Sequence, residues 1–185
     1  MAISFRPLTE QEIEVRVARV TNAGVELLLF KDARVDQNIL DETVGAENWQ
    51  CEYYEHKNTL FCKVGILIAG GTLDLDNSGL HTSSERWVWK ANAGAPSNME
   101  AQKGEASDAF KRACFCWGIG RELYTAPRIF VYADKCKTIK EGKNGKIQCF
   151  DRFHVEKVRI ENGQITGLSI WNDSTNHRCF TWVIE

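Results

Sequence analysis

The apolar and polar positions along the chain predict one long amphipathic helix in its middle. On a helical projection of about 100° per residue, one stripe of the segment 97–117 collects its apolar residues: Met99, Ala106, Phe110, Ala113 and Trp117. Ser97 and Glu100 follow a proline and form the pattern of a capping box, which predicts the start of the helix. Gly118 and Gly120 predict its end, because glycine readily adopts the left-handed conformation of a helix exit.

Alternating apolar and polar residues predict a three-stranded antiparallel meander before this helix. Its strands are expected at 49–55, 59–69 and 84–92. A tight turn through His56-Lys57-Asn58 joins the first two. Further upstream, a helix is predicted at 35–44 and a short apolar strand at 25–30. The alternation at 13–20 suits a strand as well as a helix, and both remain open.

The pattern after the helix predicts a lysine-rich loop and then a C-terminal β extension at 150–185. Residues 134–147 combine lysines with glycines, which is typical of a mobile, solvated loop, although such a loop also suits a nearby phosphate backbone. A hairpin is expected at 153–171, because Asn162-Gly163 favours a type I′ turn, and a last strand at 179–184. The predicted fold class is therefore α+β, with a β-β-β-α core and an additional C-terminal β-hairpin.

Composition predicts one intracellular domain. The chain has 185 residues, 43% of them hydrophobic, which is enough for a sizeable core. No apolar run approaches the roughly 20 residues of a membrane span, and the sequence MAISFRPLTE lacks the apolar region of a signal peptide. Seven cysteines, an odd number at irregular spacing, favour a reducing compartment. We therefore expect a cytoplasmic protein.

The net charge of −2 conceals a strong asymmetry along the chain. Residues 1–85 carry 7 Lys/Arg and 14 Asp/Glu, whereas residues 86–159 carry 15 and 8. A basic middle third suits a localised groove for a polyanion, and complementary regions suit head-to-tail assembly. The alternative, that these charges mix on the folded surface, stays open.

The polar face of the predicted helix carries its most informative side chains. Lys111 and Arg112 follow Asp108 by three and four residues, and Phe115 projects between the two cations. One interpretation is a solvated face tethered by Asp108, with Phe115 packed on a neighbouring element or subunit. The other is a set of cations for phosphates beside an aromatic ring for bases.

Motifs for metal, nucleotide or catalysis are mostly absent. Cys114 and Cys116 point about 200° apart on the helix, the four histidines are scattered and no C-x-x-C occurs, so no structural metal is expected. No phosphate-binding loop pattern is present, so no ATP is expected. Asp74 and Asp76 suggest a metal-dependent nuclease, but Asp-x-Asp before Asn-Ser-Gly is more often a turn. We predict no catalytic residues.

The helix resembles the Rad-fifty-two/Rad-twenty-two family of single-strand annealing proteins. The segment KGEASDAFKRA at 103–113, followed by Trp117-Gly118, matches the family pattern K-x-x-x-[ST]-D-[AG]-[LF]-K-R-A-x-x-x-[FW]-G. Upstream, the phage branch that includes Sak-type annealases is matched by a further set: Ala33-Arg34-Val35, Leu40-Asp41, Val44-Gly45 and Asn48-Trp49. The resemblance covers about residues 8–131.

The resemblance implies a core that assembles into rings and holds single-stranded DNA in a basic groove. It implies ATP-independent annealing of complementary strands. Lys111 and Arg112 match the family's inner-groove basic pair, whereas Phe115 stands where the family often has an arginine. Arg121 is the candidate to replace that arginine. An outer-site lysine of the eukaryotic members falls near Asn92, which leaves Lys90 as the nearest candidate.

Further expectations follow from the same resemblance. Arg86 and Lys103 complete the candidate DNA contacts. The long tail of the eukaryotic members is missing, which favours a phage or bacterial origin and the cytoplasm of a bacterial host cell. The expected partners are single-stranded DNA with its complement, further copies of the chain, and a phage exonuclease or single-strand-binding protein. The alternatives are a module that coats single strands without annealing them and the metal-dependent nuclease.

Overall fold

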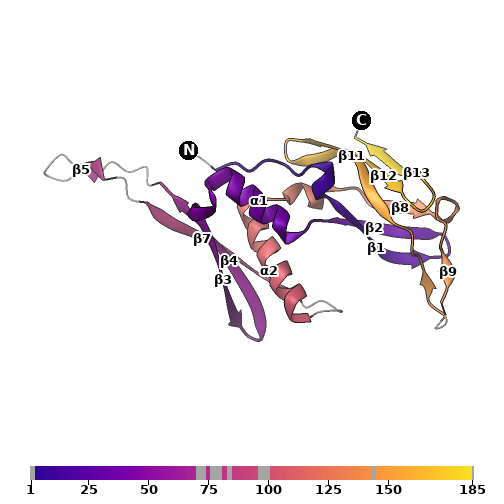
Figure 1. The fold of residues 1–185 in the computed structure, drawn as a ribbon, viewed down its shortest axis with the longest axis horizontal. Coiled ribbons are helices and arrows are strands. Elements are labelled where there is room, and N and C mark those ends of the chain that lie inside the picture. The colour runs from indigo at the N-terminus through magenta and orange to yellow at the C-terminus, as the bar shows by residue number, and fades with distance from the viewer. Residues whose placement is uncertain are drawn as a thin grey trace. The chain divides into compact units, whose positions relative to one another are not determined.

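The chain folds into two compact units, each of which is described here by itself (Figure 1). The first consists of Met1–Arg6 and Ala33–Ile119, and the second of Pro7–Asp32 and Gly120–Glu185. The computed structural model describes residues 3–69, 74–75, 81–82, 85–95, 101–142 and 145–184, with the backbone alone at 74–75, 81–82 and 101–103. That the whole chain acts as a single annealing domain stays a prediction.

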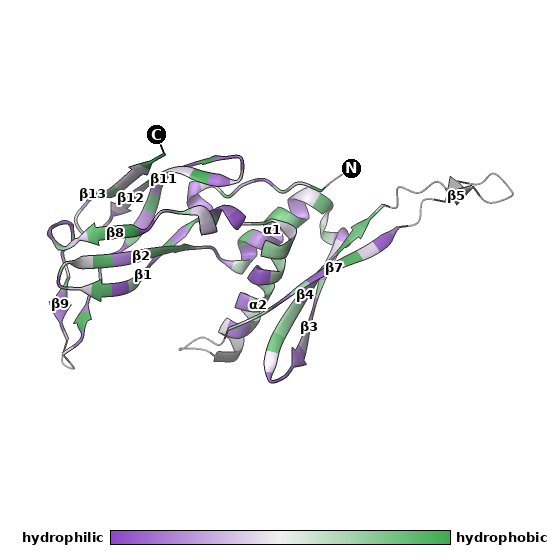
Figure 2. Cartoon of the chain, turned by 180° about the vertical axis from the view of Figure 1, so that it is seen from behind, coloured by the Kyte–Doolittle hydropathy of each residue, from purple (hydrophilic) through white to green (hydrophobic). Residues whose placement is uncertain are grey.

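The first unit contains the predicted meander. Its strands are β3 (Trp49–His56), β4 (Thr59–Ile68) and β7 (Arg86–Ala93), which pair antiparallel in the order β3-β4-β7. Lys57 and Asn58 both have positive φ, 52° and 57°, as a two-residue I′ turn requires. The central strand β4 is hydrophobic along most of its length, whereas the end of β3 is hydrophilic (Figure 2). A second, short pair, β5 (Asp74–Leu75) and β6 (His81–Thr82), lies between β4 and β7 in the sequence.

Two helices complete the first unit. Helix α1 (Ala33–Val44) is followed by the 3-10 helix η2 (Ala46–Asn48), and α2 (Ala101–Trp117) packs along β4 and β7 (Figure 1). The predicted stripe is confirmed at Phe110 and Ala113, which are buried, and Ala109 and Cys114 widen it. The predicted stripe omitted these two residues because each lies about 40° outside it at 100° per residue. The predicted cap residues Ser97 and Glu100, like Met99, lie outside the described residues.

Gly94 sets how closely the sheet of this unit approaches α2, and Gly118 ends the helix. A Cβ on Gly94 would lie 2.2 Å from the carbonyl oxygen of Glu105, so only a glycine lets the end of the sheet touch the backbone of α2. The predicted helix end is confirmed, since α2 stops at Trp117 and Gly118 follows with φ +113°. The sheet and the helix are thus held at a fixed distance, which orients the outer face of α2.

The second unit is a nearly closed six-stranded antiparallel sheet. In the order β13-β12-β11-β1-β2-β8, its strands are His177–Val183, Gln164–Asn172, Phe153–Glu161, Glu14–Thr21, Gly24–Phe30 and Ile129–Tyr132. The edge strands β13 and β8 contact one another, which is what nearly closes it. The predicted C-terminal hairpin is confirmed, with positive φ at Asn162 and Gly163, and the open choice at 13–20 is decided as a strand.

Short elements fill the remainder of the second unit. They are η1 (Glu10–Glu12), η3 (Arg121–Thr125), η4 (Ala133–Lys135), β9 (Lys140–Glu141) and β10 (Ile147–Gln148). The predicted loop at 134–147 therefore contains the β9–β10 hairpin. The core of the unit is aliphatic: Val25, Leu27, Ile129, Val131, Ile165, Leu168 and Ile170 are buried. Buried Glu122 accepts a hydrogen bond from the backbone N–H of Leu8 at 2.7 Å. No pattern in the sequence predicted this interaction.

Among the described helices, none is both long and apolar enough to cross a membrane.

Candidate nucleic-acid interface

The outer face of α2 carries the two cations that the sequence singled out. Arg112 is exposed, and its Nε donates a hydrogen bond to Oδ2 of Asp108 at 2.7 Å. The same oxygen accepts a hydrogen bond from the backbone N–H of Ala95 at 2.9 Å. The predicted tether between Asp108 and Arg112 is thus confirmed. Asp108 is itself bound to the segment after β7. The ion pair with Asp108 therefore holds the guanidinium of Arg112 in one orientation.

Lys111 lies at the border between the buried and the outer face of the helix. It directly follows Phe110 and precedes Cys114 by three residues, and both of these side chains are buried. Lys111 itself is half-buried. A lysine in this position packs its aliphatic stem against the core and extends its ammonium to the surface. Within the described part of the chain, that ammonium makes no hydrogen bond or ion pair. It therefore remains able to bind an anion.

Phe115 is half-buried on the same side of α2, between the azimuths of Lys111 and Arg112. Its position agrees with the pattern that placed an aromatic ring within the charged face. A ring of intermediate exposure suits packing against another surface as well as stacking, so both interpretations of Phe115 stay predictions.

The side chain of Lys90 lies at the C-terminal end of α2. Its Nζ donates to the carbonyl oxygen of Cys116 at 3.0 Å and lies 4.4 Å from the centre of the Trp117 ring. A cation beside the last carbonyl groups of a helix is favourable, because these groups form the negative end of the helix dipole. Trp117 is fixed in turn, since its indole N–H donates to the carbonyl oxygen of Val64 at 2.9 Å. Lys90 thus links β7 to the C-terminal end of α2. The sequence did not predict this contact.

Asn92, the position expected near an outer site, also faces the helix end. Its amide nitrogen lies 3.6 Å from the sulfur of Cys116, and its amide oxygen accepts the backbone N–H of Ala93 at 2.8 Å. Arg86 stands at the start of β7 and is exposed. Lys90 and Asn92 are therefore both bound within the first unit, which leaves Arg86 as the exposed candidate on this strand.

Two further candidates cannot be joined to this face. Lys103 belongs to the first turn of α2, where only the backbone is described. Arg121 is the first residue of η3 in the second unit, where it is exposed. Asp76 lies outside the described residues, and of Asp74 only the backbone is described. The structure therefore does not test the nuclease alternative.

The comparison with protein families identifies the family of the chain. A model of the Rad52/22 family double-strand break repair proteins matches residues 6–144, which is more than half of the chain and includes all of α2. The chain belongs to the Rad52/22 family. Proteins of this family are non-catalytic annealing proteins that bind single-stranded DNA in repair and recombination. No curated protein and no solved structure matches the chain.

The family match ends inside the β9–β10 hairpin. It takes in Arg6 and Ala33–Ile119 of the first unit and the strands β1, β2 and β8 of the second, but not β11, β12 and β13. Membership in the Rad52/22 family therefore bears on the outer face of α2 and leaves the C-terminal strands without an assigned role.

Proposed function

We propose that this Rad52/22 family protein binds single-stranded DNA through the outer face of α2 and anneals complementary strands without ATP. The observation that carries the proposal is the pair of adjacent cations Lys111 and Arg112 on one helix face, in a chain of this family. Asp108 orients the guanidinium of Arg112, and half-buried Lys111 lies beside it on the same helix. Such a face presents two adjacent positive charges to a phosphate backbone.

Contacts of this kind suit annealing because they avoid the bases. Arginine and lysine bind phosphate oxygens, which lie on the backbone of every nucleotide and carry no sequence information. A strand held by its phosphates keeps its pairing edges available to a second strand. Base pairing then supplies both the specificity and the free energy of the reaction, so no nucleotide hydrolysis is required.

The other candidate residues have graded roles in this proposal. Arg86, Lys103 and Arg121 are proposed to extend the phosphate contacts. Lys90 remains the candidate for an outer site, although its ammonium would have to leave the carbonyl oxygen of Cys116 to bind a phosphate. For Phe115 we propose a packing or subunit contact, because a ring stacked on each base would obstruct an incoming strand.

The assembly, the origin and the partners belong to the same proposal. We propose that the chain forms a ring, in which one face of each copy binds a different face of the next, as closed head-to-tail contacts require. A Sak-like phage origin, the cytoplasm of a bacterial host and a partnership with an exonuclease or single-strand-binding protein are proposed on the sequence resemblance alone. The lysine-rich segment 134–147 is proposed as an accessory contact.

The test is a double substitution, Lys111→Ala with Arg112→Ala, measured by fluorescence anisotropy with labelled oligo-dT. Hydrogen bonds to charged groups contribute about 1.5–3 kcal/mol each, so losing two should weaken binding at least ~100-fold. The slope of log affinity against log salt should fall by about 1.4, since each single-strand phosphate contact contributes about 0.7. The fold and the oligomer should remain intact.

A matched control is Arg16→Ala with Lys157→Ala. It also removes one arginine and one lysine, both exposed, but from strands β1 and β11 of the second unit. This control should retain its affinity for oligo-dT. If the α2 double variant also retains it, the proposed interface is wrong.

The second candidate function is a module that coats single strands without annealing them. It requires the same basic face, so DNA binding alone does not distinguish it. Mixing complementary oligonucleotides with the protein does: accelerated duplex formation supports annealing, whereas slowed formation with tight binding supports coating.

A further inference from the structure

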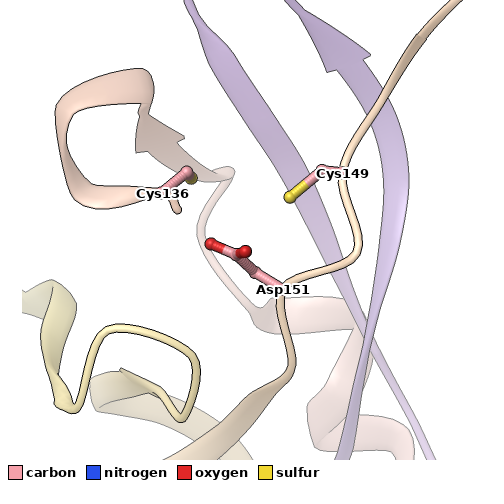
Figure 3. Close-up of side chains that lie close together, drawn as sticks. All are labelled: Cys136, Cys149 and Asp151. Atoms are coloured by element: carbon pink, nitrogen blue, oxygen red, sulfur yellow. The ribbon is translucent and has the colours of Figure 1, made fainter. Parts of the chain in front are cut away.

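Three potential metal ligands converge in the second unit, and none of them is a candidate DNA contact. They are the sulfur atoms of Cys136 and Cys149 and a carboxylate oxygen of Asp151, all within 4.8 Å of one another. Figure 3 shows the carboxylate of Asp151 and the sulfur of Cys149 directed toward the space that Cys136 also borders. Both cysteines are half-buried and Asp151 is buried. The cluster is therefore shielded from solvent in part but not completely.

The local fold explains how distant residues meet here. Cys136 follows η4 and Cys149 follows β10, so the β9–β10 hairpin between them brings the two cysteines together at its base. Cys149 and Asp151 are two residues apart in the sequence, whereas Cys136 precedes the hairpin. No C-x-x-C motif marks this cluster in the sequence, because its third member is remote from the other two.

Asp151 is held in place by its own hydrogen bonds. Oδ1 accepts the hydroxyl of Thr138 at 2.6 Å, and Oδ2 accepts the backbone N–H of Lys137 at 2.7 Å and the side-chain amide of Asn172 at 2.9 Å. These hydrogen bonds hold the carboxylate in one orientation, as a metal ligand requires.

The dimensions and the chemistry of the donors fit a thiophilic divalent cation. In tetrahedral zinc sites the Zn–S distance is about 2.3 Å, which places two sulfurs about 3.8 Å apart. Atoms already within 4.8 Å of one another reach such a geometry through small side-chain movements. Thiolates select zinc over magnesium or calcium, and a carboxylate is a regular third ligand.

We propose that Cys136, Cys149 and Asp151 form a binding site for Zn²⁺, with a water molecule as the fourth ligand. The ion displaces the two thiol protons, and its two positive charges offset two of the three negative charges of the ligands, which leaves the site with a net charge of −1. It cross-links the two ends of the segment that carries the β9–β10 hairpin, and so fixes the base of a hairpin that bears exposed Lys140 and Lys146. This proposal does not depend on the proposed DNA interface.

A disulfide between the two cysteines is the competing use of the same atoms. It would leave the convergent carboxylate of Asp151 without a function, whereas a metal ion uses all three groups. The two possibilities differ in mass, in metal content and in their response to reductant, so one set of measurements separates them.

The test uses the full chain, stripped with chelator under reductant and then titrated with Co²⁺ as a spectroscopic substitute for Zn²⁺. We expect one ion per chain, a sulfur-to-cobalt charge-transfer band, and displacement of Co²⁺ by Zn²⁺. Cys136→Ser and Cys149→Ser should each lose the charge-transfer band or reduce affinity at least tenfold. Cys116→Ser, which lies in the first unit, is the matched control and should bind normally.

A second measurement guards against variants that simply fold poorly. Hydrogen exchange of the backbone amides at 137–148 in the unmodified chain should slow when Zn²⁺ is added. Absence of a thiolate charge-transfer band in the unmodified chain, or its retention at unchanged affinity in both serine variants, overturns the proposal. A Cys136–Cys149 disulfide that persists in reductant and excludes Zn²⁺ overturns it as well.

Discussion

Replacing Lys90 by methionine separates a structural lysine from a DNA-binding one. Methionine keeps an unbranched stem of similar length but removes the ammonium that donates to the carbonyl oxygen of Cys116 at 3.0 Å. The variant therefore loses a charge-assisted hydrogen bond and the cation that lies 4.4 Å from the ring of Trp117. It retains the apolar packing of the stem.

The expected cost follows from these two contacts. Charge-assisted hydrogen bonds contribute about 1.5–3 kcal/mol, and exposed cation–π contacts about 0.5–1 kcal/mol. The two contributions share one ammonium and are not additive, and Lys90 is only half-buried. We therefore expect the free energy of unfolding to fall by about 1–2 kcal/mol. For a chain of this size that corresponds to a decrease in Tm of about 2–8 °C.

The assay pairs thermal unfolding with a salt titration of oligo-dT binding. Lys63→Met is the control, since Lys63 also lies near a ring, 4.5 Å from the centre of that of Trp89, but pairs with the exposed carboxylate of Glu52. That variant should lose less than about 1 kcal/mol. If Lys90→Met leaves Tm unchanged and instead lowers the salt slope by about 0.7, Lys90 binds phosphate and its structural assignment is refuted.

Three further predictions use other contacts. Phe115→Ala should change the oligomer size before it changes DNA affinity; light scattering that shows an unchanged oligomer beside weakened oligo-dT binding would reverse that order. Gly94→Ala should destabilise the first unit by about 1–3 kcal/mol in thermal unfolding, because the added Cβ meets the backbone of Glu105. The Arg178 guanidinium lowers the pKa of Glu156 from 4.5 to about 2, so this carboxylate stabilises the fold above pH 4.5 and loses that effect as the pH falls toward 2. Acid titration of Glu156→Gln should lack this part of the decline; a curve identical to that of the unmodified chain would contradict the ion pair.

The meander and the helix were predictable because their signals are local. Period-two alternation along β4 and the glycine at position 118 specify a strand and a helix end without knowledge of the remaining chain. The hairpin at 153–171 is equally local, since Asn162-Gly163 sets its turn. Such patterns act within a few residues, and the sequence therefore states them directly.

The partners of strands and charges were not predictable in the same way. Alternation at 13–20 gives no information on pairing, and β1 becomes a strand of a six-stranded sheet through neighbours on both sides, β2 and β11. Lys90 was predicted as a DNA contact because nothing near it in the sequence identifies the carbonyl of Cys116 as its partner. Cys136 and Cys149 are separated by a hairpin, so only the folded chain brings them together.

The distribution of charge between the two units bears on how much of the DNA binding α2 can supply. Residues 86–119 hold 5 basic and 3 acidic residues, whereas residues 120–159 hold 10 and 5, so most of the basic excess of the middle third belongs to the second unit. In the proposed interface, Lys111 and Arg112 therefore contribute through their position on α2 and not through a large local excess of positive charge. Two phosphate contacts account for a salt slope of about 1.4. A steeper slope in the unmodified chain, with the excess retained in the α2 double variant, would assign the additional phosphate contacts to other cations, for which the second unit has the larger supply.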